Sequence, residues 1–130
     1  MSSRLAALTL VTIVLVGASC GYEDDNPRAA AIVAQAYLDG FADRDASSIC
    51  RVSAPEVQAA WAAAGSGSCE AGLVPLGRYP RLRVGRVRKI DPAPPLNPRY
   101  AVAVPAQPGR EIEVGRYGST WRVVYGGPAQ

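Results

Sequence analysis

Residues 28–44, RAAAIVAQAYLDGFADR, decide how this chain is expected to fold. Small and apolar side chains recur in this stretch at spacings of three and four residues, which is the period of one face of an α-helix. That face comprises Ala29, Val33, Ala36, Tyr37, Gly40 and Phe41. The polar residues Gln35, Asp39 and Asp43 lie off this face. The stretch therefore predicts an amphipathic helix that packs against the rest of a domain.

Capping residues predict where this helix begins and where further helices follow. Asn26 or Asp25 can cap the first helix, Asp45 or Ser47 can begin a second, and Ser53 is the expected cap of a third. Helical segments are thus expected at residues 28–44, 45–52, 53–64 and 69–76.

After Pro80 the apolar period changes from four residues to two, which predicts an antiparallel sheet. The first strand is expected at residues 82–90, with a bulge at Gly85. Later strands are expected around residues 100–104, 112–114 and 121–125, with turns between them. Helices followed by an antiparallel meander are typical of an α+β domain whose helices pack on one face of the sheet.

This pattern resembles the nuclear transport factor 2-like superfamily, in the small lipoprotein form found in the envelopes of GC-rich bacteria. The resemblance covers residues 28–126. It depends on the opening pattern A-x-x-Y-L-x-x-F-A-x-x-D, on the pair Cys50 and Cys69, and on the closing W-R-V. It implies a cystatin-like α+β cone, in which a curved antiparallel sheet of about four strands wraps around helices, often with a pocket inside.

The first twenty residues predict export. Arg4 provides a positive charge, and the apolar run at residues 5–16 is shorter than the roughly 20 residues of a spanning helix but suits a signal peptide. Small residues at positions 17–19 precede Cys20. The segment resembles a bacterial lipoprotein signal, although that family prefers Leu at position 17 and Gly or Ala at position 19.

This second resemblance implies that residues 1–19 are removed and that Cys20 is acylated at the outer face of the cell membrane. Three other interpretations stay open: a secretory signal cut near Ser19, which gives a soluble secreted protein, an uncleaved anchor, or a buried helix. On the lipoprotein interpretation, residues 20–27 form an acidic tether, residues 28–127 the domain, and residues 128–130 a tail.

The three cysteines agree with this interpretation. An odd number in an exported chain leaves one thiol unexplained. If Cys20 carries lipid, then Cys50 and Cys69 remain as a pair, and an oxidising compartment favours a disulfide between them. Two cysteines in a chain without histidine do not make a usual zinc site, so neither a metal nor another cofactor is expected.

The absence of histidine excludes several classes of enzyme. It rules out Ser-His-Asp and Cys-His arrangements and the commonest general base near neutral pH. Ketosteroid isomerase-like enzymes use an Asp base with Tyr and protonated Asp donors instead. Tyr37 could point into the cone, but Asp39, Asp43 and Asp45 are expected on the solvent side or at the helix end. A non-enzymatic binding or protein-interaction module is therefore expected, with a small-molecule-binding or isomerase/cyclase-like protein as the alternative.

Two groups of residues are candidate binding sites. The aromatic group, which could line a pocket or simply form the core, comprises Tyr37, Phe41, Trp61, Trp121 and Tyr125. The basic group, which could form an interaction face or a solvated sheet face, comprises Arg81, Arg83, Arg86, Arg88 and Lys89. If the bulge restores the alternation, the four arginines share the outer face of the sheet.

Charge is unevenly distributed, because residues 20–75 carry a net charge of −5 and residues 76–130 carry +7. Near an anionic membrane, each basic residue can contribute about 1 kcal/mol. The expected partners are the membrane, through the lipid on Cys20, and an envelope protein or an anionic polymer or lipid. Nucleic acid is not expected for an exported protein, and the sequence does not predict an oligomeric state.

Overall fold

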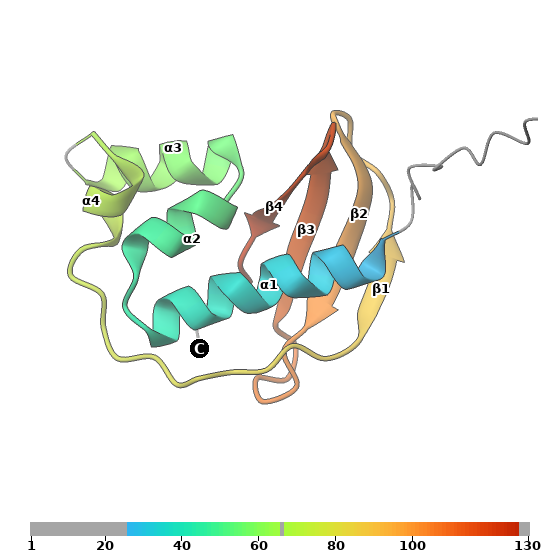
Figure 1. Ribbon diagram of the computed structural model, residues 1–130, viewed down its shortest axis with the longest axis horizontal. Coiled ribbons are helices and arrows are strands. Elements are labelled where there is room, and N and C mark those ends of the chain that lie inside the picture. Colours follow the sequence, from blue (N-terminus) through green and yellow to red (C-terminus); the bar gives the residue numbers. More distant parts are fainter. Residues whose placement is uncertain (1–25, 66, 128–130) are drawn as a thin grey trace, which may run out of the picture.

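The computed structural model describes residues 26–65 and 67–127, in which four helices precede four strands (Figure 1). The elements are α1 (Pro27–Ala42), α2 (Ala46–Val52), α3 (Pro55–Ala64), α4 (Cys69–Leu73), β1 (Val87–Ile90), β2 (Leu96–Ala103), β3 (Glu111–Tyr117) and β4 (Thr120–Tyr125). The predicted α+β class is confirmed. The predicted signal peptide, the lipidated Cys20, most of the acidic tether and the tail at residues 128–130 lie outside the described residues.

Side-chain caps begin the first two helices where the sequence predicts them. The side chain of Asn26 accepts a hydrogen bond from the amide of Ala29 at 3.0 Å, and so caps α1. Asp45 caps α2 in the same way, by accepting from the amide of Ser48 at 3.1 Å. Each cap provides an acceptor for one of the amides that the first turn of a helix leaves without a partner.

The beginning of α3 differs from the prediction. Ser53 is completely buried, and its hydroxyl donates to the carbonyl oxygen of Ile49 at 2.7 Å instead of capping α3. Ala54 occupies the cap position without a side-chain hydrogen bond. Its backbone amide donates to the carbonyl of Val123 in β4 at 2.7 Å. This junction therefore joins the helices to the sheet.

Helix α1 covers one face of the sheet, whose antiparallel strand order is β1-β2-β3-β4 (Figure 1). The buried residues of α1 are Ala30, Ala34, Tyr37, Leu38 and Gly40. On the predicted face, Tyr37 and Gly40 are buried, whereas Ala29, Val33, Ala36 and Phe41 are only partly buried; Val33 and Phe41 still pack against the core. Small and apolar residues stand at almost every position from 29 to 34, so the sequence pattern does not determine how the helix is rotated about its axis.

A long segment without helix or strand connects α4 to β1. This segment, residues 74–86, runs back along α1 and is here called the strap (Figure 1). The predicted first strand is wrong in its first half, because β1 covers only Val87–Ile90. The amide of Gly85 donates to the carbonyl of Ala103 at 2.8 Å, and the amide of Ala103 donates to the carbonyl of Arg86 at 2.9 Å. Before Gly85 the chain leaves the sheet.

The predicted pair Cys50 and Cys69 forms a disulfide, with the two Cα atoms 6.1 Å apart, and this bond joins α2 to α4. Helix α4 also lies very close to α3. A Cβ atom added at Gly72 would overlap the carbonyl oxygen of Trp61. The position of Trp61 is therefore fixed by backbone contact as well as by its own helix.

Gly72→Ala should lower the free energy of unfolding by about 1–3 kcal/mol, because the new methyl group has no space beside the backbone of Trp61. Gly77→Ala is the matched control, since its Cβ would meet only the ring of Tyr79 at 3.8 Å. The control should be neutral or slightly stabilising. Urea denaturation measures both variants, and equal stability of the two would contradict this packing.

Tyr117, at the end of β3, donates a hydrogen bond to Glu56 of α3 at 2.8 Å. Burial and this bond raise the pKa of Tyr117 to about 12, above the ordinary value of about 10. The folded state holds this proton more tightly than the unfolded state does. The resulting stabilisation is therefore present below about pH 10 and is lost as the pH rises to about 12.

Tyr117→Phe should remove the decrease in the free energy of unfolding that ionisation of Tyr117 causes between about pH 10 and about pH 12. The measurement is the free energy of unfolding at a series of pH values from neutral to strongly alkaline. A decline equally steep in the variant would show that the Tyr117–Glu56 bond does not contribute.

Candidate functional site

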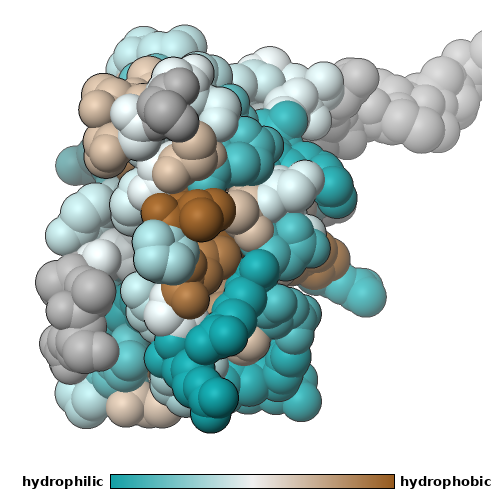
Figure 2. Space-filling model, turned by 90° about the vertical axis from the view of Figure 1, so that its left-hand side faces the viewer, coloured by the Kyte–Doolittle hydropathy of each residue, from teal (hydrophilic) through white to brown (hydrophobic). Residues whose placement is uncertain are grey.

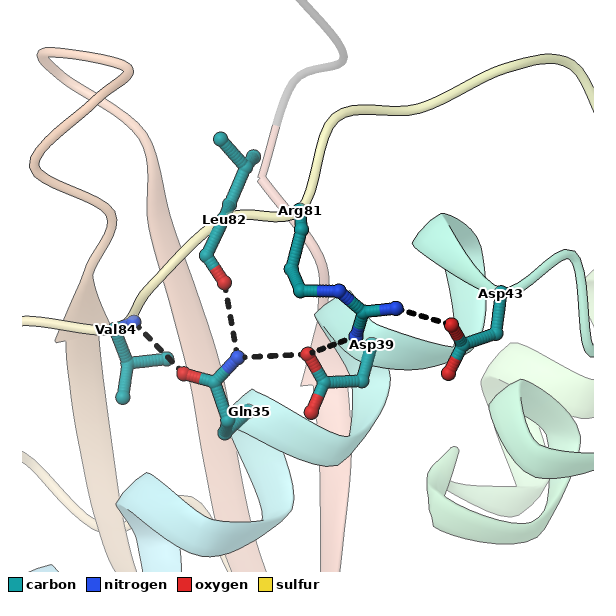
Figure 3. Close-up of polar contacts among 6 residues, drawn as sticks. All are labelled: Gln35, Asp39, Asp43, Arg81, Leu82 and Val84. Carbon is teal, nitrogen blue, oxygen red and sulfur yellow. Dashed lines mark hydrogen bonds and ion pairs between the residues drawn. The ribbon is translucent and has the colours of Figure 1, made fainter.

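Gln35 of α1 holds the strap with both polar atoms of its side-chain amide (Figure 3). Its Nε2 donates to the carbonyl oxygen of Leu82 at 2.9 Å, and its Oε1 accepts from the amide of Val84 at 3.0 Å. The same Nε2 also donates to Asp39 at 3.0 Å. A neighbouring strand would satisfy the same kinds of backbone group. The side chain of Gln35 therefore takes the place of a strand partner.

Arg81 attaches the strap one turn further along α1 (Figure 3). Its Nη1 lies 3.2 Å from Asp39 Oδ1, and its Nη2 donates to Asp43 Oδ1. The hydrogen bond with Asp43 and the two nearby charges raise the pKa of Arg81. Asp39 and Asp43, which were expected on the solvent side or at the helix end, are substantially exposed, and they also bind the strap. Arg81 lies over α1 and not on the outer face of the sheet, where the sequence placed it.

The strap closes one wall of a cavity of about 300 Å³. Its apolar and aromatic lining includes Tyr37, Leu38, Phe41, Trp61, Tyr79 and Leu82. Its polar lining consists of Arg78, Gln107 and Arg110. A volume of this size is at the lower end of the range for ligand pockets, about 300–1,000 Å³. A hollow of about 500 Å³ beside the disulfide is more open to solvent and is not enclosed by such walls.

Three of the five aromatic residues predicted for a pocket line this cavity, namely Tyr37, Phe41 and Trp61. The ring centroids of Tyr37 and Phe41 are 5.0 Å apart, and those of Phe41 and Tyr79 are 5.1 Å apart, both edge to face. Edge-to-face aromatic pairs of this kind are favourable. The strap thus contacts α1 through aromatic rings as well as through polar groups.

The other two aromatic residues lie elsewhere. Trp121 packs beside Tyr100, with 5.9 Å between the ring centroids, and does not line the cavity. Tyr125 is 52% exposed and lies on a shallow groove between α3 and β4. Trp121 and Tyr125 are therefore not part of the cavity under the strap.

Positive charge lies at the polar side of the cavity. The guanidinium of Arg110 is held by two hydrogen bonds: its Nε donates to the carbonyl of Gly126 at 2.9 Å, and its Nη1 donates to Gln107 Oε1 at 2.7 Å. Burial raises the pKa of Tyr37, while Arg110 acts in the opposite direction and Tyr79 adds to the increase. The Tyr37 hydroxyl is therefore protonated near neutral pH and is able to donate a hydrogen bond.

Sequence reasoning missed Arg78, Gln107 and Arg110. All three stand outside helices and strands, where no periodic pattern tells which side chains point inward. The Pro108-Gly109 turn, which places Gln107 and Arg110 on either side of it, is the one local signal.

The predicted basic face on the sheet is divided. Arg88 donates two hydrogen bonds to Glu111, at 2.7 and 3.0 Å, and this pairing raises the pKa of Arg88 and lowers that of Glu111. Lys89 follows Arg88 in β1 and so lies on the opposite side of the sheet, aligned with a residue of the helix-covered face. Arg83 and Arg86 are exposed, and neither pairs with an acid among residues 26–65 and 67–127. Their role in docking stays a prediction.

One end of the molecule, where α4 meets the strap, also exposes apolar surface. Val74, the first residue of the strap, is 66% exposed. Figure 2, which views this end, shows hydrophobic side chains gathered near its centre with hydrophilic side chains beside them. No segment among residues 26–65 and 67–127 covers this patch.

Within residues 26–65 and 67–127, no helix is long and apolar enough to cross a membrane. The same residues contain no group of three or more cysteines, acids or histidines placed to hold a metal ion. A scan against protein-family models and searches of curated proteins and of solved structures found no match to the chain. The cavity and the strap are therefore the features that bear on function.

Gln35→Ala should lower the free energy of unfolding by about 1–3 kcal/mol, because the carbonyl of Leu82 and the amide of Val84 lose their partner. Ile32→Ala on the same helix is the control, since Ile32 is 60% exposed. It should change stability by less than about 0.5 kcal/mol. Urea denaturation followed by circular dichroism compares the two. If both variants were equally stable, Gln35 would not be the attachment of the strap.

Proposed function

We propose that this chain is an exported, lipid-anchored envelope protein whose domain binds a small, largely apolar molecule without transforming it. The observation that carries the proposal is the cavity of about 300 Å³ between α1, α3 and the strap, with its aromatic lining. The proposed location depends on the sequence around Cys20. We also propose that the domain is a nuclear transport factor 2-like cone, which agrees with one helix lying across a four-stranded antiparallel sheet.

The cavity lies at the edge of the packed core, because Tyr37 and Leu38 belong to that core and also line the cavity. Val102, Ile112, Val114 and Val123 are fully buried between α1 and the sheet. Protein interiors leave few voids larger than a water molecule. A hollow of this volume, lined but not filled by the rings of Tyr37, Phe41 and Trp61, is what a bound apolar molecule requires.

The chemistry of the lining favours binding over catalysis. The titratable groups among the described lining residues are Tyr37, Tyr79, Arg78 and Arg110. Tyrosine and arginine side chains hold their protons at neutral pH and are therefore poor general bases. An isomerase-like reaction of the kind named above needs a carboxylate at the reacting atom. None of the described residues that line the cavity is an Asp or a Glu.

The neutral probe 4-phenylbutan-1-ol tests this function. It should produce saturable shifts of the backbone amide NMR signals of Phe41 and Leu82, which line the cavity. Trp61→Ala should weaken binding at least about tenfold, because the apolar wall is lost. Trp121→Ala is the matched control, since Trp121 does not line the cavity. It should leave the affinity unchanged.

Circular dichroism checks that both variants are folded. Two results would contradict the proposal: no saturable shift up to the solubility limit of the probe, or equal binding by the two tryptophan variants.

A further inference from the structure

The arginines of the cavity point to a particular class of ligand. We propose that the cavity binds an amphipathic anion, which has a short apolar body and a carboxylate or phosphate head group. This inference rests on the proposed function and names the chemistry of the molecule that it would bind.

Arg110 is held in place by hydrogen bonds, and its guanidinium still has N–H groups that can donate to a ligand. Its bonds to Gly126 and Gln107 use Nε and Nη1, and its Nη2 makes no hydrogen bond within the described part of the chain. A guanidinium held in this way loses little further freedom on binding, and its remaining N–H groups suit the oxygens of an anion. The protonated hydroxyl of Tyr37 adds a neutral donor in the same cavity.

Four acids of the domain pair with arginines outside the cavity lining. Asp39 and Asp43 bind Arg81, Glu111 binds Arg88, and Glu113 binds Arg99. By contrast, Arg78 and Arg110 form no ion pair with an acid in the described residues. Arg110 is partly buried, so leaving its charge without a partner has a cost that a bound anion would reduce. Arg78 is exposed and adds positive charge at the mouth of the cavity.

The aromatic lining and the volume of the cavity indicate the chemistry and the size of the apolar part of the ligand. The rings of Phe41, Trp61 and Tyr79 provide flat apolar contact surface. A volume of about 300 Å³ has room for a body of about one ring and a short chain, and not for a complete membrane lipid. The structure therefore assigns the apolar body to the rings and the head group to Arg110 and Arg78.

Four probes with the same phenylbutyl body test this assignment on the folded protein by isothermal titration calorimetry. They are 4-phenylbutyrate, 4-phenylbutyl phosphate, 4-phenylbutan-1-ol and 4-phenylbutylammonium. At least one of the two anions should bind about tenfold more tightly than the alcohol, and the ammonium should bind more weakly than the alcohol. The tighter of the two anions identifies the head group.

Arg110→Met should weaken binding of the anion about tenfold more than binding of the alcohol, and so remove the preference for the anion. Arg122→Met is the matched control, because Arg122 lies on β4 opposite Gly115 and does not line the cavity. Arg122→Met removes one positive charge, as Arg110→Met does, and should leave the preference for the anion over the alcohol unchanged.

Three outcomes would overturn the inference. Equal binding of the anions and the alcohol would refute the ligand class while leaving the proposed binding function in place. An equal loss in the Arg110 and Arg122 variants would attribute the preference to net charge and not to the cavity. If no probe bound at all, the proposed function itself would fail.

Discussion

The arrangement of this domain depends on the side-chain amide of Gln35. The strap, residues 74–86, has no secondary structure of its own, and its backbone groups need partners wherever they are shielded from water. Gln35 provides a donor and an acceptor at the spacing that Leu82 and Val84 require. Arg81, which pairs with two acids of α1, adds modest electrostatic attraction because these side chains are about half exposed. Together these contacts hold a segment that would otherwise be mobile.

The position of the strap creates the cavity. Because Leu82 and Val84 are held on α1, the preceding residue Tyr79 packs against Phe41. Together with Arg78, Tyr79 closes one side of the space between α1 and α3. Arg110 faces the same space from the β2–β3 connection, where it is held by its own hydrogen bonds. An apolar wall and a fixed positive group thus meet at one site, and the proposed function and its ligand class both follow from that combination.

Local patterns were sufficient to predict most elements of the fold but not its long-range contacts. The caps at Asn26 and Asp45 follow from residue type and position. The pair Cys50 and Cys69 was expected because the lipoprotein interpretation assigns the third cysteine, Cys20, to lipid. The alternation of Leu82 and Val84 resembles a strand, but its partner is a helix residue almost fifty positions earlier, which no periodic pattern reveals. In the cavity the aromatic residues of α1 and α3 could be predicted from helical spacing. The loop residue Arg110 could not, because its direction is set by tertiary contacts.

The central claim is that the strap forms part of a binding site, and hydrogen exchange at the amide of Val84 tests it most directly. This amide donates to Gln35 and is released when the strap leaves α1. A ligand that contacts the strap binds more tightly when the strap lies on α1 than when the strap has left it. Saturating 4-phenylbutyrate should therefore slow exchange at Val84, by about the factor by which it stabilises the attached strap. Unchanged exchange at Val84, with binding confirmed in the same sample, would contradict the claim that the strap forms part of the binding site.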